Sequence, residues 1–283
     1  MSLSILTNTT AMQTQIGLNK SSNAVSQAMQ RLSSGLRINS AADDAAGYAI
    51  AQGLTAQVNG LQQASQNVSD ATSMVQTADA ALNNVQGMLQ RISELAVQYK
   101  NGDLSSQDQT DIQSEVDQLT SEINRQQNTS QFNGISLLDG NANSGANVVF
   151  QVGSGASDTL SVSFASVEGN LTAGFCWSNV SNAASHVFDL SSTTALTDVN
   201  TAINNISSMA ANLGAVQNRL QYTSNAISVT QENMSSSLSN IQDVNMATEM
   251  TTMTQQQVLQ QAGTAMLAQA NSQPQLVLKL ITG

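Results

Sequence analysis

Residues that build catalytic and metal-binding centres are nearly missing from this sequence. It contains one cysteine, Cys176, and one histidine, His186. A single cysteine excludes an intramolecular disulfide and a multi-cysteine metal site, and we expect Cys176 to be a small, partly buried apolar residue. A zinc site or a histidine-based triad would have to be built around His186 alone, and the motifs H-E-x-x-H, G-x-S-x-G and the P-loop do not occur. The sequence therefore predicts a protein that is not an enzyme and carries no metal or cofactor.

Proline, aromatic residues, basic residues and long apolar runs are also scarce. Pro274 is the only proline, so long helices can continue without interruption. Eight Lys and Arg stand against nineteen Asp and Glu, which gives a formal net charge of -11. Nucleic acid is not an expected partner, because binding its backbone needs a basic patch. No apolar run approaches the ~18 residues of a membrane span. The first four residues also lack the basic region of a usual secretory signal, so we expect neither a membrane partner nor a cleaved signal peptide.

Two long heptad repeats occupy the two ends of the chain. In each repeat every seventh residue is apolar, and in the first a second row three residues further on completes both seam positions of a coiled coil. The two main rows are Leu54, Leu61, Val68, Val75, Leu82 and Leu89, and Ile206, Leu213, Leu220, Ile227, Met234 and Ile241. Neither helix can bury its stripe alone, and the simplest solution pairs them along an intramolecular seam. The expected fold is mainly α, a long antiparallel coiled-coil helix bundle that forms a rod with paired N- and C-terminal helices.

Shifts in composition divide the chain into five segments. We predict an N-terminal arm (1–44), an N-terminal helical part of the rod (45–140), a β-hairpin with a short variable surface segment (141–195), a C-terminal rod helix (196–242) and a C-terminal arm (243–283). The hairpin is expected because apolar and polar residues alternate in two runs of the third segment.

A second helix is predicted inside the N-terminal part of the rod. The run 100–103 ends the first long helix, and Ser105 with Asp108 three residues later resembles a capping box. The pair Asn133 and Gly134 closes the second helix with a turn.

The two arms contain too little apolar surface to offset the entropy of ordering them one at a time. The conformational entropy lost when a residue's backbone is fixed costs more free energy than the burial of most of these small polar side chains contributes. We therefore expect both arms to stay mobile in a monomer and to become ordered only against neighbouring copies.

Several motifs in the same order resemble those of bacterial flagellins. The N-terminal ones are residues 30–40, 43–47, 90–98, 131–134 and 151–153, and the C-terminal ones are residues 259–264 and 267–271. The resemblance covers about residues 1–165 and 196–275. The segment between them is much shorter than the outer domains of large flagellins, and the residues after Pro274 depart from the usual ending.

This resemblance implies a structural, self-assembling subunit of the flagellar filament that serves motility. Such a subunit is exported unfolded through the flagellar type III channel, without a cleaved signal peptide, and polymerises outside the cell. The implied partners are copies of itself in a helical homopolymer, an export chaperone, and the cap and hook-junction proteins. Apolar contacts between copies would come from the filament-core residues Leu18, Val25, Leu32, Val258, Leu259 and Leu267.

One stretch resembles the region of flagellins that is bound by the vertebrate Toll-like flagellin receptor. The matching positions are Gln90, Arg91, Leu95, Gln98 and Glu115. At ~100° per residue, Arg91, Leu95 and Gln98 share a helix face that lies away from the seam. The alternative is that Leu95 packs under the second helix and that its polar neighbours are only solvated.

Two other functions stay open from the sequence. A hook-filament junction protein shares the terminal helices but does not polymerise indefinitely, and electron microscopy would separate it from a filament subunit. An enzyme with a catalytic insert is the second, and peptidase activity lost on His186→Ala would indicate it.

Overall fold

The computed structural model describes residues 7–140, 147–164, 166–167 and 188–282. Its helices are α1 (Thr9–Ser34), α2 (Ala45–Tyr99), α3 (Ser106–Thr129), α5 (Ala195–Gln242) and α6 (Met246–Thr282), and its strands are β1 (Gln131–Phe132), β2 (Ile135–Ser136), β3 (Val148–Gln151) and β4 (Thr159–Val162). The chain forms two compact units: unit 1 is Met1–Gln57 with Glu232–Gly283, and unit 2 is Val58–Gln231. Among the described helices, none has a stretch apolar and long enough to span a membrane.

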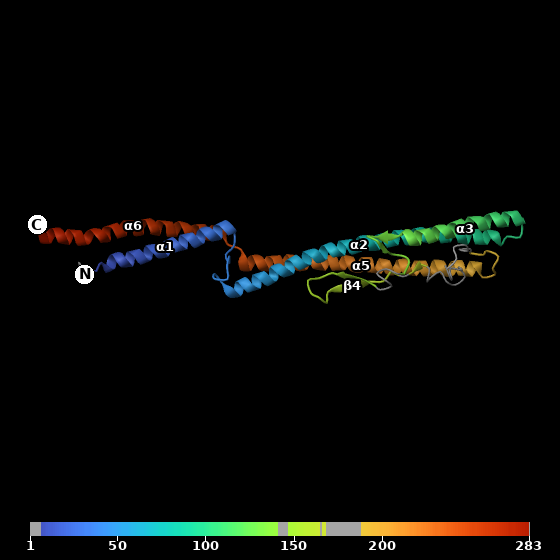
Figure 1. Ribbon diagram of the computed structural model, residues 1–283, viewed down its shortest axis with the longest axis horizontal. Helices are drawn as coiled ribbons and strands as arrows, with labels where there is room; N and C mark the ends of the chain where they lie inside the picture. The colour runs from blue at the N-terminus through green and yellow to red at the C-terminus, as the bar shows by residue number, and fades with distance from the viewer. Residues whose placement is uncertain (1–6, 141–146, 165, 168–187, 283) are drawn as a thin grey trace. The chain divides into compact units, whose positions relative to one another are not determined.

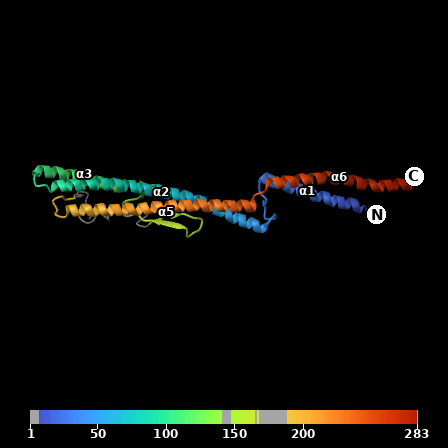
Figure 2. The ribbon, with the colours of Figure 1, turned by 180° about the vertical axis from the view of Figure 1, so that it is seen from behind.

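Unit 1 is built on the antiparallel pairing of α1 with α6, which lie side by side in both views (Figures 1 and 2). Asn8 donates from Nδ2 to the carbonyl of Ala270 at 2.8 Å, and Arg31 pairs with Glu249 at 3.7 Å. The residue number of the contact on α6 falls as the residue number on α1 rises, as antiparallel helices require. On α1 the inward face buries Ser21, Val25 and Ala28.

The ends of α1 are closed by capping interactions. The Asn8 side chain accepts a hydrogen bond from Ala11 N at 3.0 Å, and α1 stops at Gly35, whose φ of 73° is the left-handed conformation that glycine adopts most readily. Beyond Gly35 the chain meets the link between α5 and α6. The backbone N–H of Arg37 donates to Gln242, and that of Val244 donates to Gly35. The two interhelical links are therefore held together by backbone hydrogen bonds.

Two aspartates shape the start of α2. The Asp43 carboxylate accepts hydrogen bonds from the Ser40 hydroxyl and from the backbone N–H groups of Ser40 and Asn39, which hold the pKa of Asp43 below its ordinary value. Asp44 accepts from Gly47 N at 3.0 Å, and a Cβ on Gly47 would lie 2.5 Å from an Asp44 oxygen. A larger residue at position 47 would therefore have to displace the Asp44 carboxylate from this cap.

Unit 2 is a helical bundle with two small hairpins. Within it α2 and α5 run antiparallel (Figure 1), and Gln86 of α2 donates to Ser207 of α5 at 3.3 Å. The β1–β2 turn places Asn133 and Gly134 at positive φ, and β3 pairs with β4 in the register Val148↔Val162. Asn67 of α2 donates to the Gln151 carbonyl at 2.9 Å and so fastens β3 to the helix.

The predicted helical fold is confirmed, including the pairing of helices from the two ends and the small hairpin region. The capping box is also confirmed, since Ser105 accepts from Asp108 N while the Asp108 carboxylate accepts from Ser105 N. Both arms are helical, and α1 packs on α6 of the same chain, which buries Val25 and Ala28. That the arms are mobile in a monomer stays a prediction.

Candidate functional site

The first candidate surface lies on unit 2, where α2 and α3 run side by side. Arg91 of α2 lies between two carboxylates, donating from Nε to Glu115 of α3 at 2.9 Å and from Nη1 to Glu94 at 3.1 Å. These hydrogen bonds, chiefly the one that Arg91 donates to Glu115, raise the pKa of Arg91 above its ordinary value. All three side chains are exposed, so the cluster adds little to stability. It instead fixes the direction of a planar cation on an open helix face.

The residues around Arg91 divide by exposure. Gln90, Gln98 and Glu115 are exposed beside it, but Leu95 is only 1% exposed. The ion pair to Glu115 places α3 over this side of α2, and α3 buries Val116 and Ile123 completely. A partner that docked on the surface would meet the four polar side chains, while Leu95 supports them from below.

The heptad rows are buried wherever they lie in unit 2. Leu61, Val68, Val75, Leu82 and Leu89 of α2, and Ile206, Leu213, Leu220 and Ile227 of α5, are each at most 6% exposed. Leu54, Met234 and Ile241, which belong to unit 1, are half-buried. The seam residues in unit 2 therefore form its core, whereas the three in unit 1 are more exposed to solvent.

The second candidate surface is the outside of unit 1. Nine of the thirteen exposed large apolar side chains in the described residues belong to unit 1. They are Met12, Ile16, Met29, Ile50, Met246, Met250, Val258, Leu259 and Met266. A groove beside Val258 and Leu259 is completed by Thr251, Thr254 and Gln255 of the same helix. Exposed large apolar side chains that gather on one part of a protein are typical of a contact with another protein.

The predicted filament-core residues fall on different sides of this pair of helices. Val258 and Leu259 are exposed, whereas Val25 is 7% exposed, and Leu18, Leu32 and Leu267 are half-buried. Leu18 lies 3.5 Å from the point where a Cβ on Gly263 of α6 would stand. The N-terminal row therefore faces α6 of its own chain. The exposed Met12, Ile16 and Met29 were missed because they lie outside the heptad row, which was the only signal used.

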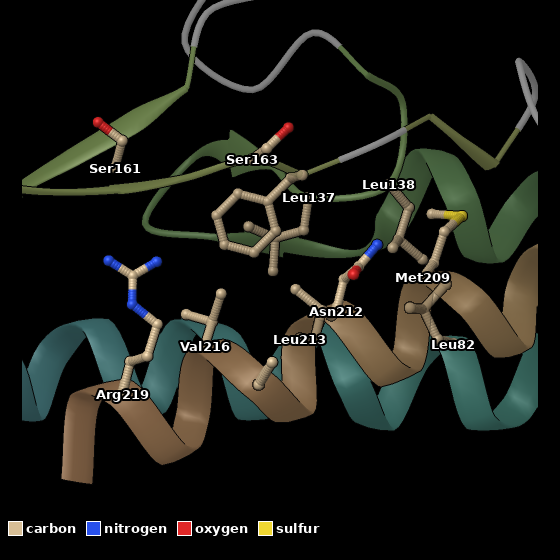
Figure 3. Close-up of a pocket in the computed structure, with 12 residues that line it drawn as sticks. Leu82, Leu137, Leu138, Ser161, Ser163, Met209, Asn212, Leu213, Val216 and Arg219 are labelled. Carbon is tan, nitrogen blue, oxygen red and sulfur yellow. The ribbon is translucent and has the colours of Figure 1, made fainter. Parts of the chain in front are cut away.

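An apolar cavity of about 340 Å³ lies between the helices and the hairpins of unit 2. Leu82, Met209 and Leu213 come from the helices, Leu137 and Leu138 from the segment after β2, and Ser161 from β4 (Figure 3). The described residues contain no cluster of three or more His, Cys, Asp or Glu that could hold a metal. Cys176 and His186 lie outside the described residues. Most of the cavity lining is apolar, and Ser163, Asn212 and Arg219 add polar groups to it.

The two ends of the chain match models of flagellin domains. The bacterial flagellin N-terminal helical region matches residues 5–143, and the bacterial flagellin C-terminal helical region matches residues 196–281.

Curated relatives match over nearly the whole length. A flagellin of Bacillus subtilis (strain 168) is 40% identical over 301 residues, covering 97% of this chain and 98% of its own. A flagellin of Halalkalibacterium halodurans is 40% identical over 256 residues, covering 90% and 91%. The flagellar filament 33 kDa core protein of Treponema phagedenis is 39% identical over 293 residues, covering 97% and 98%.

Proposed function

Because the chain belongs to the bacterial flagellin family, we propose that it polymerises through the outer apolar surface of unit 1 into the flagellar filament, and so serves motility. The family is structural and not enzymatic, and its members form the filament outside the cell. The observation that carries the proposal is the concentration of exposed apolar side chains on unit 1. Burying them between copies is favoured by about 25 cal/mol for each Å² removed from water.

The residues of the arms take two roles in this proposal. Val25, Leu18 and Leu32 hold α1 against α6, and Val258 and Leu259 present an apolar face to the next copy. Charge would not compete with such contacts, because unit 1 contains few ionisable groups and the Arg31–Glu249 pair is satisfied within the chain. Apolar contact is non-directional but additive, which suits a repeating polymer.

A matched pair of substitutions tests which unit drives assembly. Val258 of α6 and Val229 of α5 are both 59% exposed, but they lie in unit 1 and unit 2 respectively. We expect Val258→Asp to stop seeded polymerisation, since a charge would be buried without a partner, while Val229→Asp still polymerises. Both variants should melt like the unaltered protein. Equal polymerisation of the two variants would exclude the surface at Val258 from assembly.

Electron microscopy of the unaltered protein tests the polymer itself. Filaments of unlimited length are expected of a filament subunit, whereas a hook-filament junction protein stops after a limited ring or stack. Absence of filaments over a range of protein concentrations would contradict the proposal.

We also propose that the chain is exported unfolded through the flagellar type III channel, without a cleaved signal peptide. The single cysteine supports this route, because no intramolecular disulfide has to be opened before the chain is threaded. The proposed partners along the route are an export chaperone, the hook-junction proteins and the cap.

A further proposal concerns the α2–α3 surface of unit 2. Gln90, Arg91, Gln98 and Glu115 form a polar surface suited to the vertebrate Toll-like flagellin receptor, with Leu95 packed beneath them. Support comes from the rigid setting of Arg91 between two carboxylates, since a cation already held in place loses little entropy on binding.

A further inference from the structure

Methionine is distributed unevenly between the two units. Eight of the eleven methionines belong to unit 1, and Met74, Met88 and Met209 make up the remainder. Five of the eight, namely Met12, Met29, Met246, Met250 and Met266, are 48% to 63% exposed. In unit 2, by contrast, Met74 is 2% and Met209 is 8% exposed. The most accessible thioethers of the described chain therefore lie on the surface that the proposed function assigns to assembly.

Three of the exposed methionines share a helix face with another exposed apolar residue. Met246 and Met250 are four residues apart on α6, and Met12 stands four residues from Ile16 on α1, so each pair shares a helix face. Methionine suits such a contact because its unbranched side chain adapts to an irregular partner surface. The same sulfur atom is the group in these helices that is most easily oxidised.

We propose that these five methionines form an oxidation site that switches assembly off, an inference that rests on the proposed function. A hydroperoxide such as H2O2 supplies the oxidant. The thioether sulfur donates an electron pair to one peroxide oxygen and the O–O bond breaks. The proton on the transferred oxygen passes to the leaving hydroxide, which departs as water and leaves an S=O bond. The product is a polar sulfoxide, which has to be desolvated when two copies meet.

The position of the site makes the switch depend on the state of the subunit. In a monomer the five methionines are 48% to 63% exposed, and in the polymer the next copy covers them. Monomers are therefore sensitive to peroxide and assembled subunits are protected. Sulfoxide formation is reversible by methionine sulfoxide reductases, so an oxidised monomer can regain assembly.

The decisive measurement uses a partly oxidised chain whose methionines are all unchanged. All samples carry Cys176→Ser, so that the thiol does not react. Monomer is treated with H2O2 until about one methionine per chain is oxidised and is then seeded, and peptide mass spectrometry compares polymer with unassembled protein. We expect sulfoxide at the five positions to be depleted in the polymer by about tenfold, while sulfoxide at Met88 is distributed evenly. Equal sulfoxide content at the five positions in both fractions would overturn the inference.

A variant links the effect to these side chains. The critical concentration for polymerisation is measured before and after peroxide treatment in two chains, one with the five methionines and one with leucine at all five positions. Complete oxidation should raise it about tenfold or more in the methionine chain and leave it within about twofold in the leucine chain. An equal rise in both chains would place the effect elsewhere and overturn the inference. Failure of untreated methionine chain to polymerise would instead overturn the proposed function.

Discussion

At the residue scale, Arg91 makes two ion pairs while its side chain stays 49% exposed, so its role in stability can be separated from its role in recognition. Its two carboxylate partners are themselves exposed, so solvent screens the attraction. The contacts orient the guanidinium without contributing much to folding.

Substitution of Arg91 should therefore affect recognition and not folding. We expect Arg91→Ala to leave the melting temperature within measurement error and to lower receptor activation by monomer about tenfold, as loss of an oriented arginine anchor does. Receptor signalling in cells and thermal melting measure the two effects. Arg125→Ala is the matched control, since Arg125 is an exposed arginine on α3 that pairs with Glu122. Signalling by Arg91→Ala at the wild-type level would mean that this chain is recognised elsewhere or not at all.

Leu95 shows what the sequence could and could not determine about a single residue. Helical periodicity placed it off the α2–α5 seam, but a helix face does not reveal which element covers it. The structure has it 1% exposed, with α3 held over that side by the Arg91–Glu115 pair. Which helix covers a given face depends on tertiary packing and leaves no periodic signal, so the alternatives could not be separated before the fold was known.

At the scale of elements, the seam of unit 2 should be the most sensitive part of the protein to truncation. Leu220 lies in the α5 row and is fully buried, so its removal leaves a cavity. We expect Leu220→Ala to lower the free energy of unfolding by about 2 to 5 kcal/mol, measured by denaturant or thermal unfolding. Tyr222→Ala, at a position 76% exposed on the same helix, is the control and should cost much less. Similar losses for both would contradict the assigned faces of α5.

The start of α3 should make stability depend on pH. The Ser105 hydroxyl and backbone N–H hold the pKa of Asp108 below its ordinary value. A carboxyl whose folded pKa is lowered contributes stability above its unfolded pKa of about 3.9 and loses it as pH falls through the folded pKa. We expect the melting temperature of wild type to exceed that of Asp108→Asn at pH 7, with the difference shrinking toward zero below about pH 3.9. A difference that stays constant down to pH 2 would show that this charge does not stabilise α3.

Helices were predicted well because their signals are local. The heptad rows, the break at 100–103 and the Ser105 capping box each depend on residues a few positions apart, and α2 ends at Tyr99 as expected. The pairing of helices from the two ends was predicted, but the partner of the N-terminal row was not, because a seven-residue row shows that a partner exists and not which one. The row Leu18, Val25, Leu32 fits an intramolecular partner as well as a neighbouring copy.

For the whole molecule, the two units should differ in resistance to protease. The α1–α6 pair contacts solvent on most of its surface, whereas α2, α3 and α5 enclose a core within unit 2. We expect limited proteolysis of the monomer to remove both arms and leave a fragment spanning roughly residues 45–240, because local opening is cheapest where few contacts must break. Mass spectrometry identifies the fragment. Cleavage inside unit 2 before the arms are trimmed would contradict this order.

Val25 and Val258 separate two ways in which the same molecule can fail to assemble. Val25 is 7% exposed on the side of α1 that faces α6, and Val258 is 59% exposed on the outside of α6. Aspartate at position 25 would place an unpaired charge in the intramolecular contact, so α1 and α6 should part before any neighbour arrives. We expect Val25→Asp to stop polymerisation and to accelerate removal of the arms by protease about tenfold, since the opening that cleavage requires becomes more frequent.

The Val258→Asp variant should stop polymerisation while its arms are cleaved at the wild-type rate, and unit 2 should keep its thermal unfolding transition in both. If Val25→Asp leaves the cleavage rate unchanged, Val25 does not hold the arms together. If it also polymerises normally, the antiparallel pair of arms is not the form of the subunit that enters the filament.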